Sequence, residues 1–220
     1  MQCKGAIFDF DGTLVDSMSI WQEVGAIYLK DMGYTPPPQL CQILSPMSLE
    51  QSAHYLKENY ALPQSISQII QGVLKKVEEF YRYQVQPKPN VLPFLEKLQA
   101  KGVKMCIASS TDQALIQAVL ERYKMESFFE QIFTCSAVGY GKDNPFIFEQ
   151  ALAFLRTPKQ QTLVFEDAYY AVKTAKSANF CVVAIYDQYE SHPKEVKSLA
   201  DVYLSQYPQA DSFLQQIQTL

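Results

Sequence analysis

The sequence predicts an α/β fold in which a parallel sheet is wrapped by helices and interrupted by one helical insertion. Short apolar runs of strand length recur along the chain, and helical patterns lie between the later runs. Strand alternating with helix is typical of a parallel sheet with helices packed on its faces. One long stretch, from about residue 17 to about residue 85, carries helical patterns only. This stretch predicts a helical domain inserted into the sheet domain.

Six strands are predicted for the sheet, and most are uninterrupted apolar runs, which is typical of strands that are buried on both faces. They span residues 6–8, 103–108, 131–135, 162–165, 181–185 and 202–204. Apolar residues at helical spacing predict helices between the later strands, at Leu92 to Leu98, Leu115 to Val119, Phe146 to Leu155 and Ala168 to Ala178. The first of these helices is expected to stop at Gly102.

The inserted stretch contains three helical signals. Ile20 to Tyr28 mark a first helix, Ser48 with Gln51 has the form of a capping box, and Ile66 to Tyr81 have apolar residues at helical spacing. Trp21 is expected to pack inside this helical bundle. The proline-bearing segment 87–89 reads as the return linker. We therefore predict a sheet domain of residues 1–16 and 86–220 and a helical domain of residues 17–85.

Composition limits the classes of partner. A formal net charge of −4 provides no positive field to attract nucleic acid or an anionic membrane surface. The N-terminal residues resemble neither a signal peptide nor a membrane span. The five cysteines are scattered without CxxC spacing, which favours reduced thiols over a metal or disulfide framework. We expect a cytoplasmic protein that is a monomer or weak dimer and binds neither nucleic acid nor membrane.

Asp9 and Asp11 follow the first predicted strand and are the clearest candidates for chemistry. In extended chain, side chains two residues apart lie on the same face, and the carboxyl ends of parallel strands are where such sheets bind ligands. Two nearby carboxylates suit displacement at phosphorus, because one attacks while the other, kept protonated, donates to the leaving oxygen. A divalent cation would withdraw charge from the transition state. The alternative is an ordinary Asp-Gly surface turn.

Residues 9–17, Asp-Phe-Asp-Gly-Thr-Leu-Val-Asp-Ser, resemble the first motif of the haloacid dehalogenase-like hydrolases. The second motif of that family, a serine or threonine that ends a core strand and binds the phosphoryl group, is matched by Ser109 in residues 103–110. The resemblance implies phosphoryl binding by Gly12, Thr13, Ser109, Ser110 and Lys142. Taken alone, Ser-Ser-Thr-Asp before a helix is also an ordinary helix cap.

The third and fourth family motifs are also matched, and in the expected order. Lys142 resembles the lysine that opens a helix, with Asp143 standing where the pattern often has proline; an exposed loop lysine is the alternative. Glu166 and Asp167 resemble the acidic motif, although carboxylates also suit an ordinary helix N-terminus. The resemblance implies a Mg²⁺ site made by Asp9, the backbone carbonyl of Asp11 and Asp167, with Glu166 as a ligand or outer partner.

The resemblance spans almost the whole chain and implies a Rossmann-like core with a helical cap, as in the beta-phosphoglucomutase and phosphoglycolate phosphatase subgroup. It implies a magnesium-dependent phosphatase of a small phosphorylated metabolite, in which Asp9 is the nucleophile, Asp11 the acid and base, and Lys142 a fixed cation. A phosphosugar mutase is the alternative, but Leu49 stands where those mutases have an arginine for a second phosphate. Lys57 or Arg82 are possible substitutes. A non-catalytic phosphoryl-binding protein is the third hypothesis.

Overall fold

The computed structural model of the protein describes residues 2–45 and 47–219. The chain forms two compact units, one made of Met1–Ser17 with Val85–Leu220 and one of Met18–Gln84. Each predicted domain boundary lies one residue from a boundary between these units. Pro46, three residues before Leu49, is outside the described residues. That the larger unit is a catalytic core and the smaller unit a cap stays a prediction.

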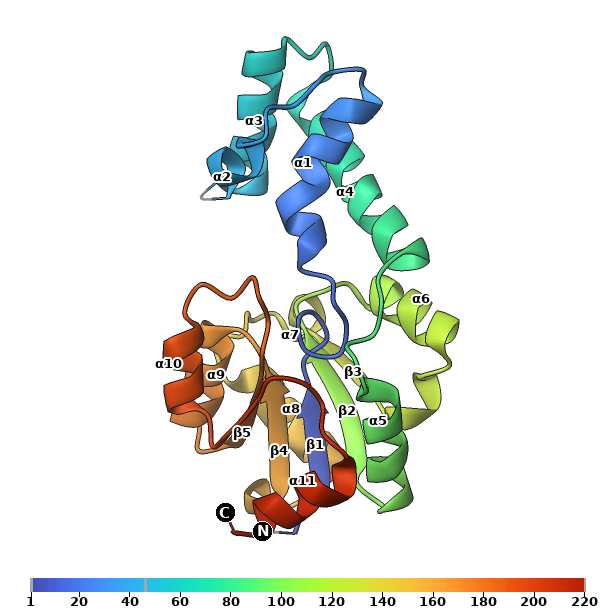
Figure 1. Cartoon of the computed structure of the whole chain (residues 1–220), viewed down its shortest axis with the longest axis vertical. Helices are drawn as coiled ribbons and strands as arrows, with labels where there is room; N and C mark the ends of the chain where they lie inside the picture. The colour runs from blue at the N-terminus through green and yellow to red at the C-terminus, as the bar shows by residue number, and fades with distance from the viewer. Residues whose placement is uncertain (1, 46, 220) are drawn as a thin grey trace. The chain divides into compact units, whose positions relative to one another are not determined.

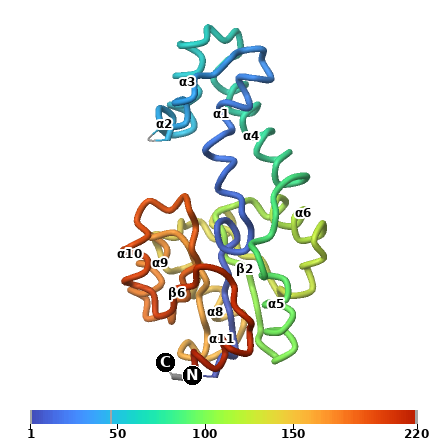
Figure 2. Tube along the Cα trace, viewed as in Figure 1, coloured from blue at the N-terminus to red at the C-terminus, as the bar shows by residue number. Residues whose placement is uncertain are grey.

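The larger unit is built on a single parallel sheet of six strands in the order β3-β2-β1-β4-β5-β6 (Figures 1 and 2). The strands are β1 Gly5–Phe8, β2 Lys104–Ser109, β3 Ile132–Thr134, β4 Thr162–Glu166, β5 Cys181–Ile185 and β6 Val202–Leu204. This topology confirms the predicted α/β class and all six predicted strands. Phe8, the last residue of β1, pairs with Ile107 of β2 and with Phe165 of β4. The carboxyl ends of the three central strands therefore lie together.

The two faces of the sheet are buried by different side chains. Ile7 and Val164 face a core of mostly aliphatic residues from α8 (Phe146–Leu155) and α9 (Tyr169–Ser177). The next residues along the same strands, Phe8 and Phe165, point to the other face because side chains alternate along a strand. Their rings stack there with centroids 4.2 Å apart, and Phe94 of α5 (Val91–Ala100) packs edge-on to Phe165. Both faces of β1 and β4 are thus dry, which is why their sequences lack alternation.

The helices of this unit include four that the sequence predicted and several short ones that it did not. The predicted ones are α5 Val91–Ala100, α6 Gln113–Tyr123, α8 Phe146–Leu155 and α9 Tyr169–Ser177. The others are α7 Cys135–Val138, α10 Pro193–Leu199 and α11 Ala210–Gln216, with the 3₁₀ turns η1 Glu126–Phe128, η2 Lys159–Gln161 and η3 Ile217–Thr219.

The smaller unit consists of helices α1 Ser19–Asp31, α2 Leu40–Leu44, α3 Leu49–Tyr60 and α4 Ile66–Tyr83. Ser48 and Gln51 form the predicted capping box at the start of α3. A second capping box, Ser65 with Gln68, opens α4, and the sequence reading had not singled it out. None of the helices in the described part of the chain is both long and apolar enough to span a membrane.

The two chain segments that lead out of the larger unit are held side by side. The backbone N–H of Asp16 donates to the carbonyl of Gln86 over 2.8 Å, and Val15 forms an antiparallel bridge with Pro87. The ammonium of Lys88 lies 2.6 Å from the buried carboxylate of Asp187, in the loop after β5. These contacts fix the entry and the return of the helical insertion to one place on the sheet domain.

Candidate active site

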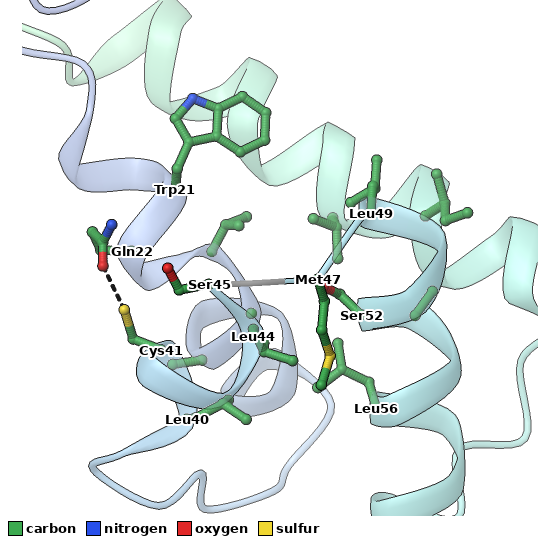
Figure 3. Close-up of a pocket in the computed structure, with 16 residues that line it drawn as sticks. Trp21, Gln22, Leu40, Cys41, Leu44, Ser45, Met47, Leu49, Ser52 and Leu56 are labelled. Carbon is green, nitrogen blue, oxygen red and sulfur yellow. Dashed lines mark hydrogen bonds between the residues drawn. The ribbon is translucent and has the colours of Figure 1, made fainter. Parts of the chain in front are cut away.

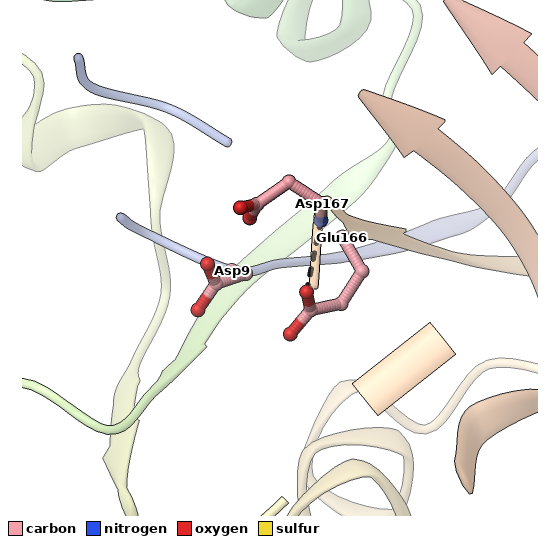
Figure 4. Close-up of side chains that lie close together, drawn as sticks. All are labelled: Asp9, Glu166 and Asp167. Atoms are coloured by element: carbon pink, nitrogen blue, oxygen red, sulfur yellow. Dashed lines mark hydrogen bonds between the residues drawn. The ribbon is translucent and has the colours of Figure 1, made fainter. Parts of the chain in front are cut away.

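Three carboxylates converge where β1 and β4 end. Asp9 follows β1, Glu166 is the last residue of β4, and Asp167 comes directly after it. The backbone N–H of Asp9 donates to the carbonyl of Phe165 over 2.9 Å, which extends the strand pairing up to the site. One carboxylate oxygen of each residue lies within 4.8 Å of the others, and all three residues are buried (Figure 4). The register of two neighbouring strands thus creates the cluster.

Lys142 supplies the positive charge in this cluster. Its side chain is 2% exposed, so the alternative of a solvated loop lysine does not hold. It lies in the loop before α8 rather than in the first turn of that helix. The ammonium donates to a carboxylate oxygen of Asp9 and, over 2.6 Å, to Glu166 Oε1. Burial disfavours the charged form, but these two carboxylates raise the pKa of Lys142 above its usual value and keep it a cation.

The charges of the cluster do not balance, because three buried carboxylates share one ammonium. Burial, reinforced by the charges of Glu166 and Asp11, raises the pKa of Asp9 to about 8 despite the opposing effect of Lys142. Burial and the neighbouring carboxylates likewise raise the pKa of Asp167 well above its usual value. A divalent cation would neutralise the two remaining negative charges, and its hard oxygen ligands are already gathered. The donor set therefore fits such an ion.

The raised pKa values predict how cation binding depends on pH. Below about pH 8 the metal-free protein holds a proton on Asp9, and an ion that needs the carboxylate must displace it. We expect the dissociation constant for Mg²⁺ to fall about tenfold per pH unit for each proton released, from pH 6 towards pH 8, and to level off above. Isothermal titration calorimetry in buffers of different ionisation enthalpy measures the constant and the proton release together.

The control for this experiment is Asp211→Asn, which removes an exposed carboxylate whose neighbours are Lys97 and Lys101. This variant should reproduce the pH dependence of the unmodified protein. An affinity for Mg²⁺ that stays constant between pH 6 and pH 8 would contradict the assignment of the raised pKa values to the binding site.

Glu166 and Asp11 differ in the kind of partner that each accepts. Glu166 receives hydrogen bonds from Lys142 and, on Oε2, from the backbone N–H groups of Asp167 at 2.9 Å and Ala168 at 3.0 Å. These partners only donate, so each of them meets a lone pair of a Glu166 carboxylate oxygen. Both Asp11 oxygens instead accept from hydroxyls, of Ser17 at 2.7 Å and of Thr111 at 2.6 Å. A hydroxyl can donate to a carboxylate or accept from a carboxylic acid, so these partners suit a group that changes protonation state.

The turn after Asp11 is shaped by its contact with Asp167. Gly12 has a φ of +72°, and a Cβ at this position would lie 2.7 Å from Cγ of Asp167. The hydroxyl of Thr13 donates to Asp167 Oδ1 over 2.8 Å, and the carbonyl of Thr13 accepts from the buried hydroxyl of Tyr207 over 3.2 Å. Phosphoryl binding by Gly12 and Thr13 stays a prediction. The Thr13 hydroxyl is committed to the acidic cluster, and the backbone N–H of Gly12 donates to the carbonyl of Val15 over 2.9 Å, which leaves the backbone N–H of Thr13 for that role.

Ser109 ends β2, which pairs with β1 on the side opposite β4, and Ser110 follows it. Ser109 is fully buried, and its hydroxyl accepts from the backbone N–H of Thr111 over 3.0 Å. Ser110 is exposed, with its hydroxyl 3.4 Å from the sulfur of Cys135. Asp112 is the N-cap residue of α6 but makes no side-chain capping bond, so the ordinary helix cap is not what this segment forms. Phosphoryl binding by both serines stays a prediction.

The helical unit contains a separate cavity of about 210 Å³ between its four helices (Figure 3). Leu49, at the start of α3, lines it together with Trp21 of α1, which is 46% exposed; the expectation that Trp21 packs inside the bundle was wrong. Polar groups are few, and Cys41 donates to Gln22 over 2.5 Å. Among the described residues, no Asp, Glu, Lys or Arg lines this cavity. It offers no charge for an anionic group.

The structure brings together most residues that the sequence proposed and adds three that it had not assigned. Asp9, Glu166, Asp167 and Lys142 form one contact network, to which Thr13 is joined. The new residues are Ser17, Thr111 and Tyr207, which hold Asp11 and the turn after it. Ser17 is the last residue of the first matched motif and Thr111 directly follows the second, which is the signal that could have drawn attention to them.

The chain matches a family model, and it is similar to named phosphatases in sequence and to a solved structure in fold. The family model described as haloacid dehalogenase-like hydrolase matches residues 6–185. The chain is 25% identical over 175 residues to the phosphorylated carbohydrates phosphatase of Thermotoga maritima, covering 80% of this chain and 81% of that one. It is 22% identical over 188 residues to the phosphoglycolate phosphatase of Aliivibrio fischeri, covering 78% of each. Among solved structures, the "putative beta-phosphoglucomutase from Thermotoga maritima" superposes with a TM-score of 0.84 at 21% identity, over 100% of both chains.

Proposed function

The chain belongs to the haloacid dehalogenase-like hydrolases, and from this premise we propose that it is a magnesium-dependent phosphatase of small phosphorylated metabolites. One observation carries the proposal: Asp9, Glu166 and Asp167 converge around Lys142 at the carboxyl ends of two parallel strands. Asp11 lies two residues beyond Asp9, held by hydroxyls. This arrangement contains a nucleophile, a fixed cation and a separate acid and base.

In the first proposed step, a carboxylate oxygen of Asp9 attacks the phosphorus of the ester. The bond between phosphorus and the leaving oxygen breaks, and that oxygen takes a proton from the carboxylic acid of Asp11. The phosphoryl group is then attached to Asp9, the alcohol departs, and Asp11 is a carboxylate. Lys142 stays protonated throughout, since its neighbours raise its pKa, and it offsets negative charge beside the reacting oxygen.

In the second step, Asp11 takes a proton from a water molecule whose oxygen attacks the same phosphorus. The bond to Asp9 breaks and inorganic phosphate is released, while Asp11 is again protonated and ready for the next ester. Ser109, Ser110 and the backbone N–H of Thr13 are proposed to hold the phosphoryl oxygens, whereas the backbone N–H of Gly12 donates to the carbonyl of Val15 over 2.9 Å. Asp11 therefore makes both proton transfers: it gives a proton to the leaving oxygen in the first step and takes one from water in the second.

Asp9, Asp167 and the backbone carbonyl of Asp11 are proposed to hold Mg²⁺, with Glu166 as a ligand or as the outer partner that orients them. When bound, this ion screens the attacking carboxylate from the phosphoryl oxygens and withdraws charge from them. The proposal extends to a cytoplasmic location, because all five cysteines are free thiols, as is usual in a reducing compartment.

Hydrolysis is favoured over phosphoryl transfer between sugar positions. A mutase must grip a second phosphate, but Leu49 stands where the resemblance implies an arginine. The two possible substitutes are engaged elsewhere: Lys57 donates to the carbonyls of Leu62 and Gln64, and Arg82 pairs with Glu78. Water is thus the proposed acceptor.

A screen of phosphorylated metabolites with Mg²⁺ present tests the proposal. We expect release of inorganic phosphate from one or more small esters, sugar phosphates among them because one relative is a phosphorylated carbohydrates phosphatase. Addition of EDTA should abolish the release. Isomerisation of a hexose phosphate that requires a bisphosphate primer would instead support the mutase. Binding of phosphate esters without turnover of any of them would support the non-catalytic alternative.

A further inference from the structure

We infer that Thr111 is a positioning residue for Asp11, which it holds in the orientation that protonates the leaving oxygen. The inference rests on the proposed function and deepens it, because it assigns a role to a residue outside the four matched motifs. It concerns only the larger unit, in which both residues lie.

The geometry at Asp11 carries the inference. Thr111 Oγ1 donates to Asp11 Oδ2 over 2.6 Å, while Ser17 Oγ donates to Asp11 Oδ1 over 2.7 Å. The two donors come from different segments of the chain. Ser17 lies six residues after Asp11, whereas Thr111 lies 100 residues after it, beyond β2. One hydroxyl on each oxygen defines both the position and the plane of the carboxyl group. Loss of the Thr111 hydroxyl would remove one of these two restraints.

Thr111 is itself anchored. Its backbone N–H donates to the buried hydroxyl of Ser109 over 3.0 Å, so the residue is tied to the end of β2. Its side chain does not cap helix α6, because Asp112 is the N-cap residue there. The Thr111 hydroxyl is therefore available to Asp11 and links the end of β2 to the turn after β1.

Positioning of this kind matters most when the departing alcohol needs a proton. General acid catalysis contributes roughly 10²- to 10⁴-fold, and a misplacement of about 1 Å can cost about 10²-fold. An acidic phenol departs as its anion without help, whereas an alkoxide does not. Loss of the Thr111 hydroxyl should therefore affect esters unequally, and a defect in folding or in phosphoryl binding would affect them alike.

The experiment compares kcat/KM for 4-nitrophenyl phosphate, phenyl phosphate and benzyl phosphate, because kcat/KM reports transfer to Asp9 rather than the later hydrolysis. For Thr111→Val and Thr111→Ala we expect a drop of about 10- to 100-fold with phenyl and benzyl phosphate and of less than about threefold with 4-nitrophenyl phosphate. Thr111→Ser keeps the donor and should restore the rates for all three esters. The matched control is Thr157→Val, which removes a hydroxyl that contacts Thr162 over 2.7 Å at the amino end of β4.

The outcomes distinguish a failure of the proposed phosphatase activity from a failure of the proposed role of Thr111. If the unmodified protein hydrolyses none of the esters tested here or in the metabolite screen, the proposed phosphatase fails and the role of Thr111 with it. If it is active but Thr111→Val and Thr111→Ala lower kcat/KM equally for all three esters, or leave all three unchanged, the positioning role is wrong and the phosphatase stands. Thr111→Ala keeps the test decisive if valine at this position prevents folding.

Discussion

Replacing Asp9 with asparagine should lower kcat/KM for 4-nitrophenyl phosphate by at least about 10⁴-fold, because a neutral amide cannot form the phosphoryl-enzyme. The exchange nearly preserves volume, so the buried site should not collapse. It also removes one of three carboxylates that share a single ammonium, which relieves repulsion in the metal-free protein. We therefore expect a melting temperature at least equal to that of the unmodified protein at pH 8.

Acid quenching after mixing with phosphorus-labelled substrate adds a direct measurement: label should remain on the unmodified chain and be absent from Asp9→Asn. The matched control is Asp16→Asn, which changes a half-exposed carboxylate on the segment that follows the same turn. Full magnesium-dependent activity in Asp9→Asn would refute the aspartyl-phosphate mechanism.

Replacing Lys142 with methionine should damage both activity and stability. Asp9 and Glu166 would lose their shared cation while staying buried, and breaking a buried ion pair from one side costs about 3–5 kcal/mol. The loss should be largest near pH 8 in EDTA. At lower pH it should shrink, because Asp9, whose pKa is already raised to about 8, takes up a proton and no longer needs the cation. Urea unfolding at pH 6 and pH 8 measures this difference.

Activity of Lys142→Met on 4-nitrophenyl phosphate should fall about 10³-fold even with saturating Mg²⁺, because a fixed positive charge beside the reacting oxygen is lost. Lys173→Met is the control, since this lysine is exposed on α9. A change of less than about 1 kcal/mol at pH 8 would show that Lys142 does not hold the two carboxylates together.

The sheet could be predicted from sequence because its strands carry a local signal. Strands such as β4 are short, mostly apolar runs, because the side chains on both of their faces are buried. The short helices α10 and α11 have seven residues each, too few for helical spacing to stand out. They form because Val196 and Phe213 find partners in the finished core, which no local window contains.

The residues of the site also fall into those that the sequence could predict and those that it could not. Asp9, Lys142 and the Glu166–Asp167 pair could be proposed because each stands in a matched motif, at a strand end or, for Lys142, in the loop before α8. The contacts of Thr111 and Tyr207 could not, since they join positions 100 and 194 residues apart. Their partners become known only when strand order is known, and several strand orders are compatible with the same alternation of strand and helix.

The pairing of Asp16 with Gln86 has an architectural consequence. A hydrogen bond of 2.8 Å between these residues places the start and the finish of the insertion one strand spacing apart. To the sheet domain, the whole segment Met18–Gln84 is topologically a hairpin loop, and the entropy of closing a loop rises only with the logarithm of its length. A helical segment of another size could be exchanged for it at little thermodynamic cost. The helical unit can thereby change in length without disturbing the strand pairing of the sheet domain.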